Sequence, residues 1–500
     1  MLFNSYIFLL GFAPVALIGF FLLGRLNARF AAGWLAAMSI VFYGWWNPRY
    51  VPILLLSIAI NFLFGRLIDA CRADQAVRRK LLLVVAVTID LTALAYFKYA
   101  DFLIVNLDAL TGLDLALAHV VLPLGISFYT FTQLAYLVDT YRNKATEKDV
   151  LHYILFVTYF PHLIAGPIIH HKDVMPQFAK PATYRFDRDR FAIGMVFLIL
   201  GLFKKCFLAD GVAAYAGPVF DAAEHGQALT AWQAWGGALA YTFQLYFDFS
   251  GYSDMAVGLS LMLNVKLPFN FDSPYKATSI SDFWKRWHIS LSTFLRDYVY
   301  IPLGGNRSGE GRRLRNLMLT MLIGGLWHGA GWTFVIWGGL HGLYLVINHR
   351  WSALRGRIGG PAGRIEVVAG SLLTFFAVVI AWVFFRATSF QGATTMLSGM
   401  AGLNAGGSST ASVFAGTRDA LIQTWTWCVA LFTVTTLLPN SQQFVARWVS
   451  DRPSIGVEVR DTGAATWVRP GAGLALALGG LAALALMNLS RPSEFLYFNF

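Results

Sequence analysis

Apolar runs of about the length of a membrane span repeat along nearly the whole chain, separated by short polar or Gly-rich breaks. A membrane-spanning α-helix needs roughly 20 mainly apolar residues, because it must cross the hydrocarbon core. Some runs are too short to cross alone, so we predict about 11–13 transmembrane helices together with re-entrant and interfacial helices. The candidate spans are residues 3–24, 31–46, 51–68, 81–98, 118–138, 151–169, 191–209, 231–247, 251–263, 316–328, 332–348, 368–386, 421–438 and 472–489.

Two regions, residues 231–263 and 316–348, contain Gly breaks and polar side chains at membrane depth. Irregular backbone is tolerated there only inside the protein or beside a water-filled cavity, because lipid cannot pair with its N–H and C=O groups. We therefore predict an all-α polytopic membrane protein with a central pocket. A single domain is expected to fill residues 1–500, with a motif-rich core at 120–348 and C-terminal spans within 368–489.

The composition supports a membrane protein, since 57% of the residues are hydrophobic, 13% are charged and the mean hydropathy is +0.55. A soluble protein of this length would carry about 25% charged residues. The N-terminal run lacks the basic flank and the cleavage site of a signal peptide, so we expect it to be retained as the first span.

The formal net charge of +12 arises from basic residues in the loops between spans, such as Arg25 and Arg29, Arg66–Lys80 and Arg350–Arg364. This pattern is typical of the positive-inside rule and of contact with anionic lipids, and it does not indicate nucleic acid. It places the N-terminus outside and residues 25–29 in the cytoplasm. The uncharged, Gly/Ser/Thr-rich segment 402–417 is predicted to be a flexible external loop.

Several kinds of site are not expected from this sequence. Three widely separated cysteines, Cys71, Cys206 and Cys428, predict neither a disulfide framework nor a metal site. No set of His, Cys, Asp or Glu has a ligand spacing such as HExxH. There is also no phosphate-binding loop and no GxSxG elbow, so an enzyme of this kind would transfer its group directly.

The segment 264–316 is too polar to span a membrane, yet it is rich in aromatic residues. Within it, residues 281–299 alternate charged and aromatic side chains, and Ser281 provides a capping signal. We predict an amphipathic helix over 281–299 at the membrane interface. It is either a simple lipid-surface helix or a helix that lines a pocket, and His288, between Trp287 and an apolar run, favours the second interpretation.

His328 is the strongest candidate for chemistry, because it lies in a Gly-rich apolar segment where ionisable side chains are rare. Imidazole accepts a proton near neutral pH, so His328 could act as a general base on an acceptor hydroxyl that attacks a thioester or ester. The flanking small residues leave room for another part of the chain or a substrate to approach. A purely structural histidine is the alternative, and the second Trp-His pair at His288 favours function.

Other polar residues allow two interpretations each. His341 either lines the site or packs helices, and His162, His170 and His171 surround a turn that shapes a loop or an entrance. Lys204 and Lys205 either pair with Asp210 at a helix end or contact an anionic donor. Asp248 and Asp254 are expected to pair with Arg or Lys, because an unpaired buried carboxylate would be protonated.

Six motifs and the C-terminal sequence carry a resemblance over nearly the whole chain. The segments are FPHLIAGPI (160–168), GLFKKCFLAD (201–210), YFDFSGYSDMAVGLSLML (246–263), LPFNFDSPY (267–275), SDFWKRWHISLSTFLRDYVYIPLGGNR (281–307), LIGGLWHGAGWTFVIWGGLHG (322–342) and PSEFLYFNF (492–500). In these segments the chain closely resembles the membrane-bound O-acyltransferase family, in its bacterial alginate O-acetylase branch. The resemblance implies a helical ring around a central funnel or tunnel.

The resemblance implies that His328 is the catalytic histidine and His288 the second motif residue. It implies an inner-membrane enzyme of bacteria that passes acetyl groups from a cytoplasmic donor, expected to be acetyl-CoA, to an exported alginate-like polysaccharide. It also implies a periplasmic acetyltransferase partner of the SGNH type. Peptidoglycan or cellulose are alternative acceptors, and a transporter with His328 as a proton relay, or a scaffold, are alternatives from other classes.

A wider set of residues is expected to line the substrate site or tunnel. CoA phosphates would suit Arg286, Arg296 and Arg307 if these side chains face inward. The region 389–470 matches no motif and is a candidate for partner contacts. The expected lining residues are Trp284, Arg286, Trp287, Ser290, Arg296, Asp297, Trp327, His341, Asp248 and Asp254.

Overall fold

In the computed structural model, the part of the chain that can be described is helical and contains no strand. It divides into two compact units, one made of Met1–Gly201 and Tyr252–Phe269 and the other of Leu202–Gly251 and the described residues from Asn270 onward. The expectation of a single domain stays a prediction. The structure describes residues 1–117, 119–145, 147–307, 309–359, 363–404, 410–414, 419–450, 471–490 and 495–496.

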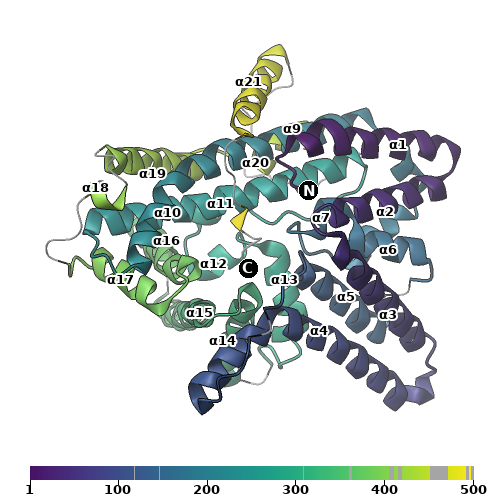
Figure 1. The fold of residues 1–500 in the computed structure, drawn as a ribbon, viewed down its shortest axis with the longest axis horizontal. Helices are drawn as coiled ribbons and strands as arrows, with labels where there is room; N and C mark the ends of the chain where they lie inside the picture. Colours follow the sequence, from purple (N-terminus) through teal and green to yellow (C-terminus); the bar gives the residue numbers. More distant parts are fainter. Residues whose placement is uncertain are drawn as a thin grey trace. The chain divides into compact units, whose positions relative to one another are not determined.

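The first unit is a bundle of apolar helices in which α1 packs on α2, α2 on α6, and α3 and α4 on α5 (Figure 1). One pair of buried polar side chains joins two of its helices, since the amide of Asn61 of α3 donates to Asp90 of α4 at 2.8 Å. Its helices are η1 (Ile7–Phe12), α1 (Ala13–Leu26), α2 (Ala28–Gly44), η2 (Pro48–Tyr50), α3 (Val51–Asp69), η3 (Ala73–Gln75), α4 (Ala76–Thr111), α5 (Ile126–Tyr141), α6 (Val150–Thr158), α7 (Phe160–Leu163), α8 (His171–Phe178), η4 (Pro181–Tyr184) and most of α9 (Arg188–Phe203).

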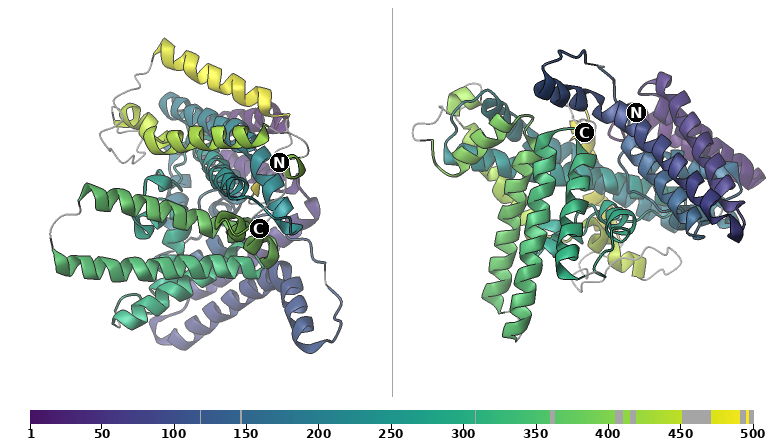
Figure 2. Two further views of the ribbon diagram at one scale, coloured as in Figure 1. Left: turned by 90° about the vertical axis from the view of Figure 1, so that its left-hand side faces the viewer. Right: turned by 90° about the horizontal axis from the view of Figure 1, so that it is seen from below.

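The second unit is built around the antiparallel pair α14 and α15, with α16 packed along α15 (Figure 2). Its helices are η5 (Lys204–Ala209), α10 (Asp210–Glu224), the first part of α11 (Ala231–Met262), η6 (Pro274–Lys276), α12 (Ile280–Trp284), α13 (Ile289–Leu295), η7 (Arg296–Tyr300), α14 (Glu310–His328), α15 (Trp332–Ile358), α16 (Arg364–Arg386), α17 (Phe390–Met400), α18 (Thr410–Val413), α19 (Ala420–Leu437), α20 (Ser441–Ser450) and α21 (Ala472–Asn488).

Six helical segments in the described part are long and apolar enough to cross a membrane by length and composition. Two shorter apolar helices, Ala28–Gly44 and Ala472–Asn488, and the more polar α11, α14 and α15 lie outside that set. The predicted total of crossings therefore stays a prediction. The six are Ile7–Leu26, Pro48–Asp69, Ala73–Thr111, Arg188–Glu224, Arg364–Arg386 and Ala420–Leu437.

The predicted break between residues 247 and 251 is wrong, because α11 runs without interruption from Ala231 to Met262. A glycine inside a helix costs about 1 kcal/mol relative to alanine. Here the helix is buried on nearly every side from Ala240 to Met262, so packing outweighs that cost at Gly251.

The single amphipathic helix predicted over 281–299 is also wrong. The chain forms α12, then a break, then α13 and the π-helical turn η7. At the break His288 takes a left-handed backbone conformation, with φ at +43°. Both Trp287 and His288 are buried, and a continuous helix would point neighbouring side chains in different directions. The cap is Ser279, whose hydroxyl accepts the Asp282 N–H, and not Ser281.

The ends of α15 and α16 differ strongly in charge. The end where α15 finishes and α16 begins carries Arg350, Arg355, Arg357 and Arg364. At the opposite end, where α15 begins and α16 finishes, Arg386 stands beside threonine and glycine residues. By the positive-inside rule we expect the arginine-rich end to face the cytoplasm and the Arg386 end to face the other side of the membrane, and this orientation stays a prediction.

Candidate functional site

The junction between α14 and α15 fixes the position of His328, which is the last residue of α14. The two helices approach backbone to backbone. A Cβ added at Gly338 would lie 2.4 Å from the carbonyl oxygen of Met321, and one at Gly325 would lie 2.3 Å from the carbonyl oxygen of Phe334. The glycines near His328 therefore admit the neighbouring helix, which is one of the two predicted uses of their space.

Aromatic rings enclose His328, and this residue is only 3% exposed. The ring centroids of Trp327, Trp337 and Phe385 lie 4.9, 5.0 and 5.1 Å from that of His328, all at steep interplanar angles. Such edge-to-face contacts hold the imidazole in one orientation. The ring of His288 lies 6.3 Å away. The structure thus brings together the two histidines that the sequence singled out.

His288 is completely buried and lies against Phe249 of α11, with ring centroids 4.7 Å apart. Burial lowers the pKa of His288 to about 3, because the charged imidazolium would lose its hydration. The side chain is therefore neutral at physiological pH. It is suited to hold a hydrogen bond and poorly suited to take up a proton.

His341 lies one turn after Trp337 on α15 and is also completely buried. The Trp284 indole N–H donates to Nδ1 of His341 at 3.3 Å. The Trp337 ring is in contact with both histidines, at 4.9 Å from His341 and 5.0 Å from His328. Among the predicted lining residues, Trp284, Trp327 and His341 therefore belong to one aromatic cluster with His328. Trp287 joins it through Trp382, at 4.9 Å.

A charged cluster is buried elsewhere in the same unit. The Lys205 ammonium lies 2.6 Å from the Asp210 carboxylate and 2.7 Å from the Asp248 carboxylate. The pairing predicted for Lys205 and for Asp248 is confirmed, and Lys204 instead donates to Ser441 at 2.7 Å. The second oxygen of Asp248 accepts the backbone N–H of Leu496 at 3.2 Å, so the cluster also holds the described C-terminal residues.

The remaining predicted lining residues of this unit form local contacts. Arg286 pairs with Asp282 at 2.9 Å. Arg296 pairs with its neighbour Asp297 at 2.7 Å and is 60% exposed. The hydroxyl of Ser290 donates to the Asn270 side chain at 2.6 Å. The exposed Arg307 follows η7. Their roles toward a donor stay predictions.

The other predicted residues lie in the first unit or outside the described part. Asp254 is buried there, and His162 pairs with the carbonyl oxygen of Phe156 at 3.0 Å. His171 contacts the Lys144 carbonyl oxygen at 3.0 Å. Much of the predicted loop 402–417, and all of 492–500 except Phe495 and Leu496, fall outside the described residues.

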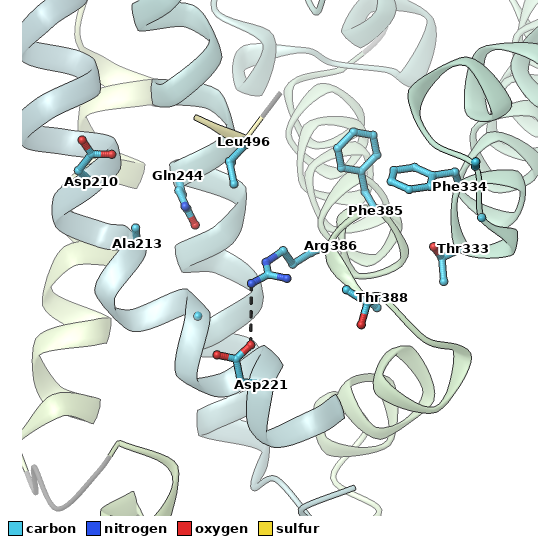
Figure 3. Close-up of a pocket in the computed structure, with 14 residues that line it drawn as sticks. Asp210, Ala213, Asp221, Gln244, Thr333, Phe334, Phe385, Arg386, Thr388 and Leu496 are labelled. Carbon is cyan, nitrogen blue, oxygen red and sulfur yellow. Dashed lines mark ion pairs between the residues drawn. The ribbon is translucent and has the colours of Figure 1, made fainter. Parts of the chain in front are cut away.

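A pocket of about 630 Å³ with both polar and apolar lining residues adjoins the aromatic cluster (Figure 3). Ala330 and Gly331, just after His328, form part of its wall, and Phe385 both lines it and packs on the His328 ring. Arg386 and Asp221 face each other across it at 4.0 Å. The pocket lies at the end of α15 and α16 that carries few arginines. Its further lining residues are Asp210, Ala213, Gly217, Gln244, Thr333, Phe334, Ala387, Thr388 and Leu496.

Sequence reasoning missed most of this pocket. Asp221, Gln244 and Arg386 are single polar residues within or at the end of apolar stretches, where snorkelling explains them equally well. Gln244 and Arg386 lie near the ends of the predicted spans 231–247 and 368–386, whereas Asp221 falls between two predicted spans and offered no such signal. Only the packing of α10, α11 and α16 brings these residues together.

Comparison of the amino-acid sequence with known proteins identifies a family and several relatives. The model of the membrane-bound O-acyltransferase family matches residues 69–391. The chain is 39% identical to a peptidoglycan O-acetyltransferase of Helicobacter pylori, over 100% of this chain and 98% of that protein. It is 43% identical to a probable alginate O-acetylase AlgI of Pseudomonas aeruginosa, over 80% and 75%. It is 27% identical to a teichoic acid D-alanyltransferase of Streptococcus thermophilus, over 52% and 68%.

Proposed function

The chain belongs to the membrane-bound O-acyltransferase family, and from this premise we propose that it O-acetylates a polysaccharide of the cell surface. The observation that carries the proposal is the position of His328. This histidine is held by aromatic rings, and Phe385, which packs on it, also lines a pocket at the end of α16 opposite the arginine-rich end. A hydroxyl group would enter through this pocket. We place the chain in the inner membrane of a bacterium.

The proposed donor is acetyl-CoA from the cytoplasm. The arginine-rich end of α15 and α16 provides the positive charge that CoA phosphates require. The CoA moiety is too polar to cross the bilayer, so only the acetyl group would pass from that end toward His328. The residues Arg286, Arg296 and Arg307 are the proposed phosphate contacts from the region of α12 and η7.

His328 would act as the general base. It would take the proton of an acceptor hydroxyl while the hydroxyl oxygen attacks the carbonyl carbon of the acetyl thioester. The C–S bond would then break, and the proton would pass from the imidazolium to the leaving thiolate. His288, neutral and held against Phe249, would orient a polar group by hydrogen bonding.

The pocket suits a sugar or a serine hydroxyl as the acceptor. Its walls combine aromatic faces, Phe334 and Phe385, with groups that hydrogen-bond to hydroxyls, such as Gln244 and Thr333. It opens on the side where an exported polysaccharide would pass. A periplasmic acetyltransferase of the SGNH type is the proposed partner that carries the acetyl group onward.

Replacement of His328 by alanine tests the proposal. Bacteria that lack their own polysaccharide O-acetylase would express this chain or the His328→Ala variant, and the acetyl content of the polysaccharide would be measured. We expect acetylation with the wild-type chain and none with the variant at equal protein level. Equal acetylation by the wild-type chain and the variant would exclude a catalytic role of His328. No acetylation by either would favour the transporter or scaffold alternatives.

The acceptor is tested by complementation in two hosts. An alginate-producing strain without its acetylase and a strain without its peptidoglycan O-acetylase would each receive the chain. Acetylated alginate supports the alginate-like acceptor that the motifs suggest. Acetylated peptidoglycan alone would favour the acceptor named for the Helicobacter pylori relative, which this chain matches over its whole length.

A further inference from the structure

Two buried N–H groups, one on Trp337 beside His328 and one on His341 beside Trp337, have no hydrogen-bond partner among the residues that the structure describes. They are the indole Nε1 of Trp337 and the Nε2 of His341. Trp337 is 1% exposed and His341 is completely buried. Leaving a buried donor unpaired is unfavourable, so such groups in a native protein call for a bound partner.

The contact with Trp284 fixes which nitrogen of His341 carries the proton. An indole N–H is only a donor, so Nδ1 of His341, which lies 3.3 Å from it, must accept. A neutral imidazole has one N–H, and it is therefore at Nε2. Both unpaired groups are thus donors, and neither can pair with the other.

The two donors lie on one face of α15, four residues apart, on the side that contacts His328. The Trp337 ring touches both histidines, with centroids 5.0 Å from His328 and 4.9 Å from His341. Several further aromatic rings pack on them, including Phe283 stacked on His341 at 6.1 Å and Trp382 stacked on Trp337 at 5.8 Å. The missing partner is therefore a hydrogen-bond acceptor that enters an otherwise apolar site.

We propose that Trp337 and His341 bind the carbonyl oxygen of the acyl thioester and stabilise the negative charge that develops on it. The inference rests on the proposed function and assigns these two residues a catalytic part in it. When the acceptor hydroxyl oxygen bonds to the carbonyl carbon, the C=O electron pair moves to oxygen, and the hydroxyl proton goes to His328. The two N–H groups donate to that oxyanion until the C–S bond breaks and the thiolate takes the proton.

Donors placed for an oxyanion act most strongly in the transition state, so their loss lowers kcat more than it changes KM. Trp337→Phe and His341→Phe each remove one N–H and keep an aromatic ring. We expect each to lower kcat for thiol release from acetyl-CoA by about 10²-fold, with the KM for acetyl-CoA changed by less than about threefold. His341→Gln, which offers an amide N–H, should recover part of the rate lost in His341→Phe.

The matched control is Phe283→Leu, which disturbs packing on the same histidine and removes no N–H group. Its kcat should stay within about threefold of the wild type. The proposal fails if the Trp337 and His341 variants keep wild-type kcat, as expected when a trapped water fills the site. It also fails if they change KM alone, or if Phe283→Leu lowers kcat as strongly as they do.

Isotope-edited infrared spectroscopy separates this inference from the proposed function. The inactive His328→Ala variant would bind acetyl-CoA labelled with ¹³C at the carbonyl. We expect the carbonyl band of bound acetyl-CoA to lie at lower frequency than that of free acetyl-CoA. When Trp337→Phe and His341→Phe are combined with His328→Ala, the band should return to the frequency of free acetyl-CoA. Bound acetyl-CoA with an unshifted band would overturn the role of Trp337 and His341 alone, whereas no binding of acetyl-CoA would overturn the proposed donor and, with it, this inference.

Discussion

Two buried regions of the second unit differ in how far their polar atoms are paired. The Lys205 ammonium lies 2.6 Å from one carboxylate and 2.7 Å from another, and a backbone N–H donates to the second of these carboxylates. Around His328, imidazole and indole nitrogens are set among aromatic rings, and two N–H groups there have no partner in the described part of the chain. The first arrangement holds helices together, whereas the second leaves hydrogen-bonding capacity for a substrate.

The largest expected effect on activity is that of His328→Ala. Loss of a general base is expected to lower acetyl transfer by about 10³-fold, within the usual range for such catalysis. The variant also loses the ring contacts of His328 with Trp327, Trp337 and Phe385, so a stability loss of no more than about 2–5 kcal/mol is expected from the cavity. Acetylation rate and thermal unfolding of the purified protein would be measured together. A larger loss of stability would show that His328 is mainly a packing residue.

The charged cluster should show the reverse behaviour. Lys205→Met leaves two buried carboxylates without their cation, and we expect it to destabilise the protein by about 3–5 kcal/mol. Thermal unfolding in detergent would measure this effect, and Asp210→Asn with Asp248→Asn in the same protein should restore part of the loss. Lys204→Met is the control, because the ammonium of Lys204 donates to a serine hydroxyl. Equal effects of the two lysine substitutions would contradict the distinction.

Helix contact at the junction can be tested with two neighbouring glycines. In Gly338→Ala the new Cβ would lie 2.4 Å from the Met321 carbonyl oxygen, so α14 and α15 must separate. We expect a destabilisation of about 1–3 kcal/mol and a fall in activity, since His328 moves with α14. In Gly339→Ala the nearest atom is 3.7 Å away, and both properties should stay close to the wild type. Wild-type stability and activity in Gly338→Ala would contradict the close packing of α14 on α15.

His288 is expected to act without changing its charge. Its pKa of about 3 means that it stays neutral from pH 5 to pH 8, and it would become protonated only as the pH falls toward 3. Asparagine is also neutral, so His288→Asn should lower activity by about tenfold, equal to about 1.4 kcal/mol, at every pH in this range. The measurement is the pH dependence of the transfer rate for both proteins. A loss that grows or shrinks with pH would assign His288 a proton-transfer role.

The smallest effect is expected at the pocket. Arg386 and Asp221 form a partly exposed pair at 4.0 Å, and such pairs contribute about 0–1 kcal/mol. Arg386→Gln should therefore leave stability unchanged and raise the KM for the acceptor by about threefold. A raised KM for acetyl-CoA instead would place the donor, and not the acceptor, in this pocket.

The helical class could be predicted from apolar periodicity, and the pairing of Lys205 with Asp210, one of two interpretations offered, from local charge. The catalytic role of His328 stays a prediction. The break at His288 was missed because tertiary burial of two adjacent side chains determines it. The continuity of α11 through Gly251 was missed for the same reason, since packing outweighs helix propensity there. The pairing of Arg386 with Asp221 joins residues 165 positions apart, and only the folded chain shows it.

The most direct test of the central claim is a sided transfer assay with purified protein in liposomes. Labelled acetyl-CoA is supplied on the side that the arginine-rich ends of α15 and α16 face, and a short polymannuronate acceptor, with the partner acetyltransferase, on the other. We predict label on the acceptor with the wild-type protein and none with His328→Ala, while Lys204→Met transfers normally. Equal transfer by the wild type and His328→Ala, or no transfer by folded wild-type protein, would contradict the account.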